Sequence, residues 1–177
     1  MTRPGPARRA RKPAGREATY SRRVAFSIIV RVRYAECDMQ GHVFNAHYLT
    51  WFDMAHTALL TTALAQPYSA IVAGGVDIVV AESGVRYLAP ARFEDELSVG
   101  VQLQEPTRTS LTSSFTIRRG EKVIATGFLR HVCVNPETMQ KMAWPDEIRA
   151  ALAPYVASDS SASPAQAAAG ESEPSSV

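Results

Sequence analysis

The carboxylate of Asp38 stands just ahead of a predicted helix in the segment YAECDMQGHVFNAHYLTWFDMAH, residues 34–56. Asp38 lies in a short loop that contains Gly41, and the helix is expected to begin at Asn45, seven residues after Asp38. The first turn of a helix has unpaired N–H donors, which suit an oxygen that becomes negative during acyl transfer. A carboxylate beside it can attack an acyl carbon or take a proton from water. An aspartate before a helix is usually only a turn former or a cap, but this join would also place a nucleophile or base next to the N–H donors of the helix.

Other reactive side chains surround this aspartate. His42 could assist proton transfer or contact substrate, or it could be a loop histidine bonded to the backbone. Glu36 is a weaker acid candidate, and Cys37 has no evident relay that would make it a nucleophile. The spacing of His42 and His47 from Asp38 fits no standard zinc site, so we expect no metal.

The elements on either side of the loop follow from hydrophobic periodicity. Residues 24–36 alternate as a half-buried strand, with Val30, Val32 and Tyr34 expected on one face. Residues 45–65 have helical spacing and predict one amphipathic helix of about five turns, with Asn45 as its N-cap. Its apolar face is formed by Tyr48, Phe52, Ala55, Leu59 and Ala63.

The rest of the domain predicts strands joined by short turns. Four apolar or alternating runs occupy residues 76–90, 97–103, 109–119 and 122–135, and a short helix is expected at 145–152. One long helix and about five strands predict an α+β fold with the helix on one face of an antiparallel sheet. A sheet this long and apolar is expected to need partner chains at its edges and on its other face, which favours a homo-oligomer.

The two ends of the chain differ from this domain in composition. Residues 1–23 hold eight Lys and Arg against one Glu, a net charge of +7, and are expected to be a disordered basic arm. Residues 158–177 are expected to be a disordered tail, which leaves residues 24–157 as the folded domain. The arm could serve as an organellar transit peptide, but its prolines argue against an amphipathic one. No apolar run approaches a membrane span or a secretory signal, and two unclustered cysteines fit a cytoplasmic protein.

Three stretches resemble a known family. The segment VRYAECDMQGHVFNAHYLTWFDMA resembles the signature of hotdog-fold thioesterases, in particular the 4-hydroxybenzoyl-CoA thioesterase and YbgC-like acyl-CoA thioesterase group. Asp38, Gly41, Asn45 and Tyr48 occupy the positions of that pattern. The stretches VRYLAPARFEDELSV and ATGFLRHVCVNPETMQKMAWPDEI look like later motifs of the family in the right order, so the resemblance spans roughly residues 24–150.

The resemblance implies a fold, an activity and a site. The fold would be a hotdog, one long central helix wrapped by a five-stranded antiparallel sheet. The activity would be hydrolysis of acyl-CoA or acyl-carrier-protein thioesters to a free carboxylic acid and a thiol. Asp38 would be the catalytic carboxylate and the N–H of Asn45 the oxyanion donor. No metal or redox cofactor would take part, and the substrate would enter at a subunit interface of a homodimer or homotetramer.

Substrate contacts are predicted from side-chain chemistry. The aromatic residues Tyr48, Trp51 and Phe52 belong to the helix core, and the resemblance implies that this helix also borders the acyl pocket. Arg86, Arg92 and Arg130 are candidates for holding CoA phosphates, or are simply solvated surface residues.

Two other functions fit parts of the sequence. A hotdog dehydratase would need an Asp–His pair at a different spacing. A non-catalytic acyl-CoA-binding module could use the basic arm against nucleic acid or a membrane. For the hydrolase, we expect neither nucleic acid nor a membrane as a partner.

Overall fold

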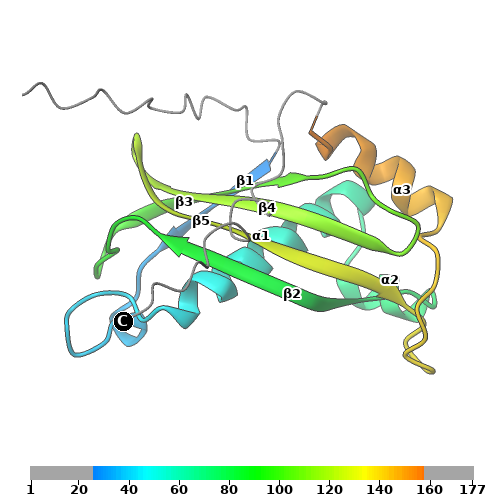
Figure 1. Cartoon of the computed structure of the whole chain (residues 1–177), viewed down its shortest axis with the longest axis horizontal. Helices are drawn as coiled ribbons and strands as arrows, with labels where there is room; N and C mark the ends of the chain where they lie inside the picture. The colour runs from blue at the N-terminus through cyan, green and yellow to red at the C-terminus, as the bar shows by residue number, and fades with distance from the viewer. Residues whose placement is uncertain (1–25, 158–177) are drawn as a thin grey trace, which may run out of the picture.

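One antiparallel sheet and one long helix make up two packed layers (Figure 1). The computed structural model describes residues 26–157. The strands are β1 (Phe26–Arg31), β2 (Asp77–Tyr87), β3 (Glu96–Leu103), β4 (Ser110–Arg119) and β5 (Lys122–Val134), in the spatial order β1-β3-β4-β5-β2. The helices are α1 (Ala46–Leu64), α2 (Tyr68–Ala73) and α3 (Asp146–Leu152), with short 3₁₀ turns η1 (Tyr34–Glu36) and η2 (Ala153–Tyr155). The predicted α+β fold, a long helix on a five-stranded antiparallel sheet, is confirmed.

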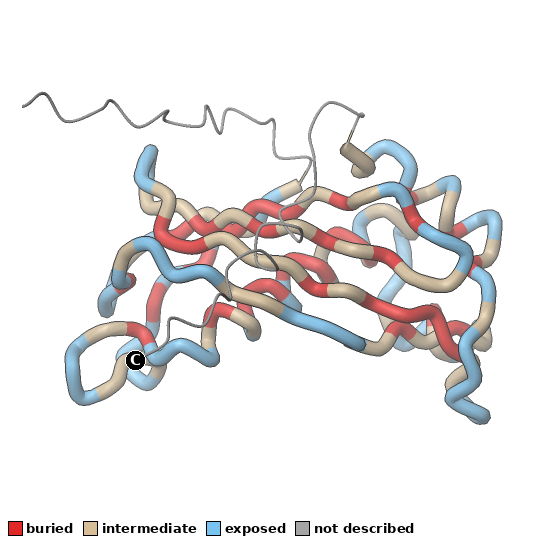
Figure 2. Tube along the Cα trace, in the orientation of Figure 1, coloured by how far each residue is buried: buried red, intermediate tan, exposed pale blue. Residues whose placement is uncertain are grey.

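Side-chain alternation gives the sheet two different faces (Figure 2). The face toward α1 is apolar, because every second residue of β3 and β4 is buried there, as at Leu97, Val99 and Phe115. The opposite face carries mainly hydroxyl and amide side chains, namely Ser98, Gln102, Thr112, Ser114, Thr116 and Thr126. This face of the sheet is therefore more polar than the face toward α1, and its cover by a partner chain stays a prediction.

Helix α1 packs its aromatic side on the sheet. Phe52 is fully buried and its ring stacks on Phe115 of β4, with the ring centroids 4.5 Å apart. The helix can approach this closely because Gly127 of β5 has no side chain, and a Cβ there would collide with the Phe52 ring. Asn45 precedes the helix as predicted, but its side chain makes no capping hydrogen bond.

The chain between β1 and α1 departs from the predicted strand. β1 ends at Arg31, and Tyr34 lies in η1 with 80% of its surface exposed instead of sharing a buried face with Val30 and Val32. The backbone N–H of Arg33 donates to Glu36 Oε2 at 2.7 Å, which bends the chain into the 3₁₀ turn. Alternation alone missed this side chain to backbone bond.

The predicted disordered segments, 1–23 and 158–177, lie outside the described residues. No helix within residues 26–157 is both long and apolar enough to cross a bilayer. Helix α2 was not predicted, because its six residues are too few to show a period.

Candidate active site

An open pocket of about 500 Å³ lies where the loop before α1 meets the chain after β2. Both walls are at the same end of the molecule, where β2 ends and α1 begins (Figure 1). The lining residues come from three segments, the loop, the first turn of α1 and the stretch that follows β2; they are Asp38, Gln40, His42, Val43, Phe44, Asn45, Tyr48, Tyr87, Leu88, Ala89 and Pro90. Four predicted residues, Asp38, His42, Asn45 and Tyr48, are thus brought together on one pocket surface.

The loop that carries Asp38 is a tight turn. Its backbone N–H donates to the carbonyl of His42 at 2.8 Å, and the N–H of Gly41 donates to the carbonyl of Asp38 at 3.0 Å. Cys37 and Val43 pair as an antiparallel bridge at the base of the turn. Gly41 has φ of +73°, a conformation that glycine adopts without strain, so it is needed for the backbone of this turn.

The two oxygens of the Asp38 carboxylate have different surroundings. Oδ1 accepts the backbone N–H of Gln40 at 2.8 Å and that of His42 at 3.4 Å. Oδ2 accepts no hydrogen bond from any residue in the range 26–157. Asp38 is therefore a turn former, as the alternative interpretation held, and it also keeps one oxygen available for chemistry.

The start of α1 has unpaired backbone N–H groups, and Asn45, which carries one of them, lines the same pocket. Within the described part of the chain, the N–H groups of Asn45 and Ala46 donate to no acceptor, as expected for a helix that lacks a side-chain cap. The Asn45 carbonyl accepts the Tyr87 hydroxyl at 3.0 Å, and the Tyr87 ring packs edge-on against Tyr48 at 5.0 Å. The last residue of β2 thus holds the first turn of the helix in place.

Tyr48 and Ala91 connect the two walls of the pocket. The Tyr48 hydroxyl oxygen accepts the Ala91 N–H at 3.3 Å, and the Ala91 carbonyl accepts the N–H of Val43 at 2.9 Å. Burial raises the pKa of Tyr48, so its hydroxyl stays neutral at ordinary pH. Since both polar groups of Ala91 are used, the loop, the helix and the chain after β2 form one connected unit.

Glu36 connects the loop to helix α1 through hydrogen bonds, and its carboxylate is not positioned to act as a second catalytic acid. Its Oε2 accepts the N–H of Arg33 and its Oε1 accepts the indole N–H of Trp51 at 3.4 Å. Trp51 is buried, as predicted for a core residue of the helix. Both oxygens of Glu36 are occupied, so its role is to tie the loop to α1.

Three predicted substrate residues lie outside the pocket lining. Phe52 is enclosed in the core, and Arg86 and Arg92 are exposed on β2 and on the β2–β3 connection. Tyr87 was missed as a site residue. It is the tyrosine of the Tyr-x-x-Pro motif at residues 87–90, so the motif itself was the available signal.

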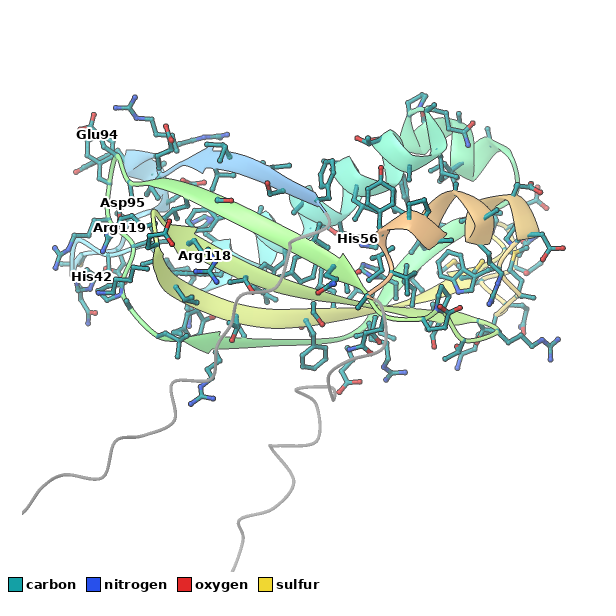
Figure 3. All side chains as sticks on the ribbon, turned by 90° about the horizontal axis from the view of Figure 1, so that it is seen from above. His42, His56, Glu94, Asp95, Arg118 and Arg119 are labelled. Carbon is teal, nitrogen blue, oxygen red and sulfur yellow. The ribbon has the colours of Figure 1, made fainter. Side chains whose placement is uncertain are left out.

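A second polar cluster lies deep in the core. His56 of α1 and His131 of β5 are each 2% exposed and stack with ring centroids 3.9 Å apart, and His56 Nδ1 lies 2.9 Å from Ser113 Oγ. Burial, and then the neighbouring His131, lower the pKa of His56 well below 6.5, and burial lowers that of His131 to about 4. His56 lies well along α1, away from the labelled residues around His42 (Figure 3). Both histidine rings are therefore packed inside the fold.

Comparison with known proteins identifies the family. A sequence model of the thioesterase-like superfamily matches residues 32–152. The chain is 32% identical over 120 residues to the acyl-CoA thioester hydrolase YbgC of Escherichia coli O6:H1, covering 67% of this chain and 89% of that protein. It is 27% identical over 125 residues to the long-chain acyl-CoA thioesterase FadM of Escherichia coli K12, covering 70% and 93%.

Solved structures agree with this assignment. A hypothetical protein from Thermus thermophilus superposes with a TM-score of 0.69 at 32% identity, covering 73% of this chain and 98% of that chain. The probable thioesterase YbaW from Escherichia coli superposes with a TM-score of 0.65 at 26% identity, covering 75% and 99%. The chain therefore belongs to the thioesterase-like superfamily and has the hotdog fold of its thioesterases.

Proposed function

We propose that this chain, an acyl-CoA thioesterase by homology, hydrolyses the thioester in the pocket beside Asp38 and the start of α1. The observation that supports the proposal is that Asp38, with one unoccupied carboxylate oxygen, and Asn45, with an unpaired backbone N–H at the helix start, line the same pocket. Thioester hydrolysis needs both groups, because one generates or replaces the attacking hydroxide and the other stabilises the oxyanion.

In the general-base route, Asp38 takes a proton from a water molecule as the water oxygen bonds to the thioester carbonyl carbon. The carbonyl oxygen becomes negative and accepts hydrogen bonds from Asn45 N–H and its neighbour Ala46. The intermediate then expels the thiolate as the C–S bond breaks, and the proton held by Asp38 passes to sulfur. In the nucleophilic route, Oδ2 bonds to the carbonyl carbon, and the C–S bond then breaks to release the thiolate, which takes a proton from solvent. Water hydrolyses the resulting mixed anhydride to the free acid and restores the Asp38 carboxylate. The free Oδ2 is compatible with either route.

Asp38→Asn tests this role with little risk to the fold. The amide oxygen of asparagine can still accept the Gln40 N–H, so the turn is retained while the charge is lost. We expect kcat for thiol release from an acyl-CoA to fall by about 100-fold or more, on the order of 3 kcal/mol. His42→Gln is the comparison for an assisting role and should have a smaller effect.

A folded Asp38→Asn enzyme with wild-type turnover would make Asp38 a structural residue only. Wild-type protein that hydrates an enoyl-CoA without releasing thiol would support the dehydratase alternative. Protein that binds acyl-CoA and turns over neither substrate would support the binding module.

We also infer that the working enzyme is a homodimer or a dimer of dimers. β2 is an 11-residue edge strand, and no described strand pairs with its outer side. Long unpaired edges invite pairing with another chain. Val80 in this strand and Tyr87 and Leu88 at its end are each about half exposed, so a second copy here would also cover the open side of the pocket.

A charge on this edge tests the assembly. Val80→Lys should leave the monomer fold intact, since this side chain is 50% exposed, but it should shift the protein to a lower sedimentation coefficient and reduce activity. Met54→Lys is a matched control on the exposed side of α1, at 42% exposure. A wild-type enzyme that sediments as an active monomer at micromolar concentration would contradict the inference.

A further inference from the structure

An ion pair between Asp95 and Arg119 joins the β2–β3 connection to the last residue of β4. Arg119 Nη1 lies 2.5 Å from Asp95 Oδ2, and the two side chains are 36% and 18% exposed, respectively. Figure 3 shows both side chains at the end of the molecule where His42 of the pocket loop lies. The ion pair of the adjacent residue, Glu94 with Arg31, is longer at 3.5 Å, and its side chains are mostly exposed. Because solvent screens an exposed pair, the Asp95–Arg119 pair is the one expected to hold the backbone.

The Asp95 carboxylate also closes a tight turn. Its Oδ2 accepts the backbone N–H of Arg92 at 2.8 Å, and the N–H of Asp95 donates to the Arg92 carbonyl at 3.1 Å. Within this turn Glu94 has φ of +68°, a left-handed conformation that residues with a side chain disfavour. The N–H of Val32 donates to the Asp95 carbonyl at 2.9 Å, and the N–H of Glu94 donates to the Val32 carbonyl at 3.1 Å. A strained turn persists only where several such bonds hold it, and the Asp95 side chain provides one of them.

The turn begins directly after Ala91, the residue that connects the two walls of the pocket. Ala91 is fully buried, its N–H donates to the Tyr48 hydroxyl oxygen, and its carbonyl accepts the N–H of Val43. Val43 belongs to the loop that carries Asp38, and Tyr48 belongs to the first turn of the helix that follows Asn45. A displacement of Ala91 would therefore move the carboxylate and the helix N–H donors relative to each other.

The charges of the ion pair lie close to Tyr48. Burial is the main cause of the raised pKa of Tyr48; among the smaller causes, the Asp95 carboxylate raises this pKa and the Arg119 guanidinium lowers it. The two charges therefore oppose each other at the Tyr48 hydroxyl. Removing Arg119 would leave the half-buried carboxylate without its cation, next to the hydroxyl that binds Ala91.

We propose that Asp95, held by Arg119, is a positioning residue for thioester hydrolysis. It holds Ala91, and through Ala91 it keeps the Asp38 carboxylate and the Asn45 N–H in a fixed relative position. This inference rests on the proposed function of the pocket. Neither side chain of the ion pair lines that pocket, so the pair acts through the backbone and not on the substrate. Because small displacements of catalytic groups slow the chemical step, loss of the pair should lower kcat more than it changes KM.

Substitutions of Arg119 test the ion pair. Arg119→Met removes the charge and keeps a long side chain, whereas Arg119→Lys retains a cation. We expect Arg119→Met to lower kcat for thiol release from an acyl-CoA about tenfold, with KM within about twofold of wild type, and Arg119→Lys to recover most of kcat. Asp95→Asn, which keeps an acceptor oxygen for the Arg92 N–H, is a second variant and should lose kcat in the same way. Glu94→Gln is the matched control, because it removes only the exposed ion pair, and its kcat should equal that of wild type.

Two further measurements separate positioning from a general loss of stability. In hydrogen exchange on the full chain, Arg119→Met should raise the exchange rates of the Ala91 and Val43 amides about tenfold, while amides in the centre of β4 and β5 keep wild-type protection. In an Asp38→Asn background, Arg119→Met should cause little further loss of kcat, because residues that act as a unit are not additive.

Wild-type kcat in Arg119→Met and Asp95→Asn would overturn the proposal. A loss of kcat without faster exchange at Ala91 and Val43 would also overturn it. Faster exchange across the whole sheet, or fully additive losses with Asp38→Asn, would show that the pair only stabilises the fold. Equal losses in Arg119→Lys and Arg119→Met would exclude the ion pair as the cause. The exchange measurement needs no activity, and the hydrolase itself fails only if wild-type protein cleaves no thioester.

Discussion

The buried histidine pair predicts that acid destabilises this fold over a defined pH range. His56 and His131 are neutral in the folded chain, because burial lowers both pKa values, that of His131 to about 4. In the unfolded chain both bind protons near the ordinary value of 6.5. Their contribution to stability is therefore complete above pH 6.5 and is lost as the pH falls from 6.5 toward 4.

The loss of unfolding free energy depends on how many protons the histidines bind only in the unfolded chain. Each histidine that is protonated only in the unfolded chain lowers the free energy of unfolding by about 1.4 kcal/mol per pH unit. At pH 5 this is about 2 kcal/mol for His131, and His56, whose pKa is lowered in the same direction, adds to it. Wild-type protein should therefore lose more than about 2 kcal/mol between pH 8 and pH 5, a large part of the stability of a domain this size.

The assay is urea unfolding followed by tryptophan fluorescence at pH 8, 7, 6 and 5, at one fixed protein concentration. His131→Leu removes one titrating ring with a side chain of similar volume, and it should lose about 2 kcal/mol less than wild type between pH 8 and 5. His47→Gln, a substitution of a partly exposed histidine on the same helix, should follow wild type. If His131→Leu loses as much free energy as wild type over this range, the buried pair does not control acid stability.

Three further perturbations have definite expectations. Gly127→Ala should lower stability by about 1–3 kcal/mol, visible as a lower Tm, because its Cβ would meet the Phe52 ring and the Gly84 carbonyl. Glu36→Ala should lower both Tm and kcat/KM by loosening the loop that carries Asp38. Glu36→Gln should lose less, because its single amide oxygen can still accept one of the two N–H donors; equal losses in the two variants would refute a hydrogen-bonding role. Deleting residues 1–22 should leave Tm and kcat unchanged and raise KM for acyl-CoA and carrier substrates at low salt only, because the basic arm attracts acidic substrates over about 8 Å at physiological salt. Identical KM values at low salt would exclude that role.

The fold was predictable where one period dominates a segment. The helix at residues 45–65 and the strands of the sheet could be read from the sequence because burying one side of each element imposes a period of 3.6 or 2. The prediction failed where a single side chain redirects the backbone, as Glu36 does at the end of β1. Strand length and apolar content also do not say which face of the sheet each residue occupies, so the polar character of the second face became visible only in the structure.

For the site, the sequence alone determined the parts: a carboxylate at 38, a glycine turn, a helix start at 45 and the aromatic residue at 48. Only the tertiary structure decided how they are supported. Tyr87 reaches the carbonyl of Asn45 across 42 residues, and Ala91 joins Tyr48 to Val43. Spacing along the chain predicts which residues are neighbours within one helix or strand, whereas contacts between segments depend on how the sheet and the helix pack. For this reason, the second wall of the pocket and the stacked histidines in the core became visible only in the tertiary structure.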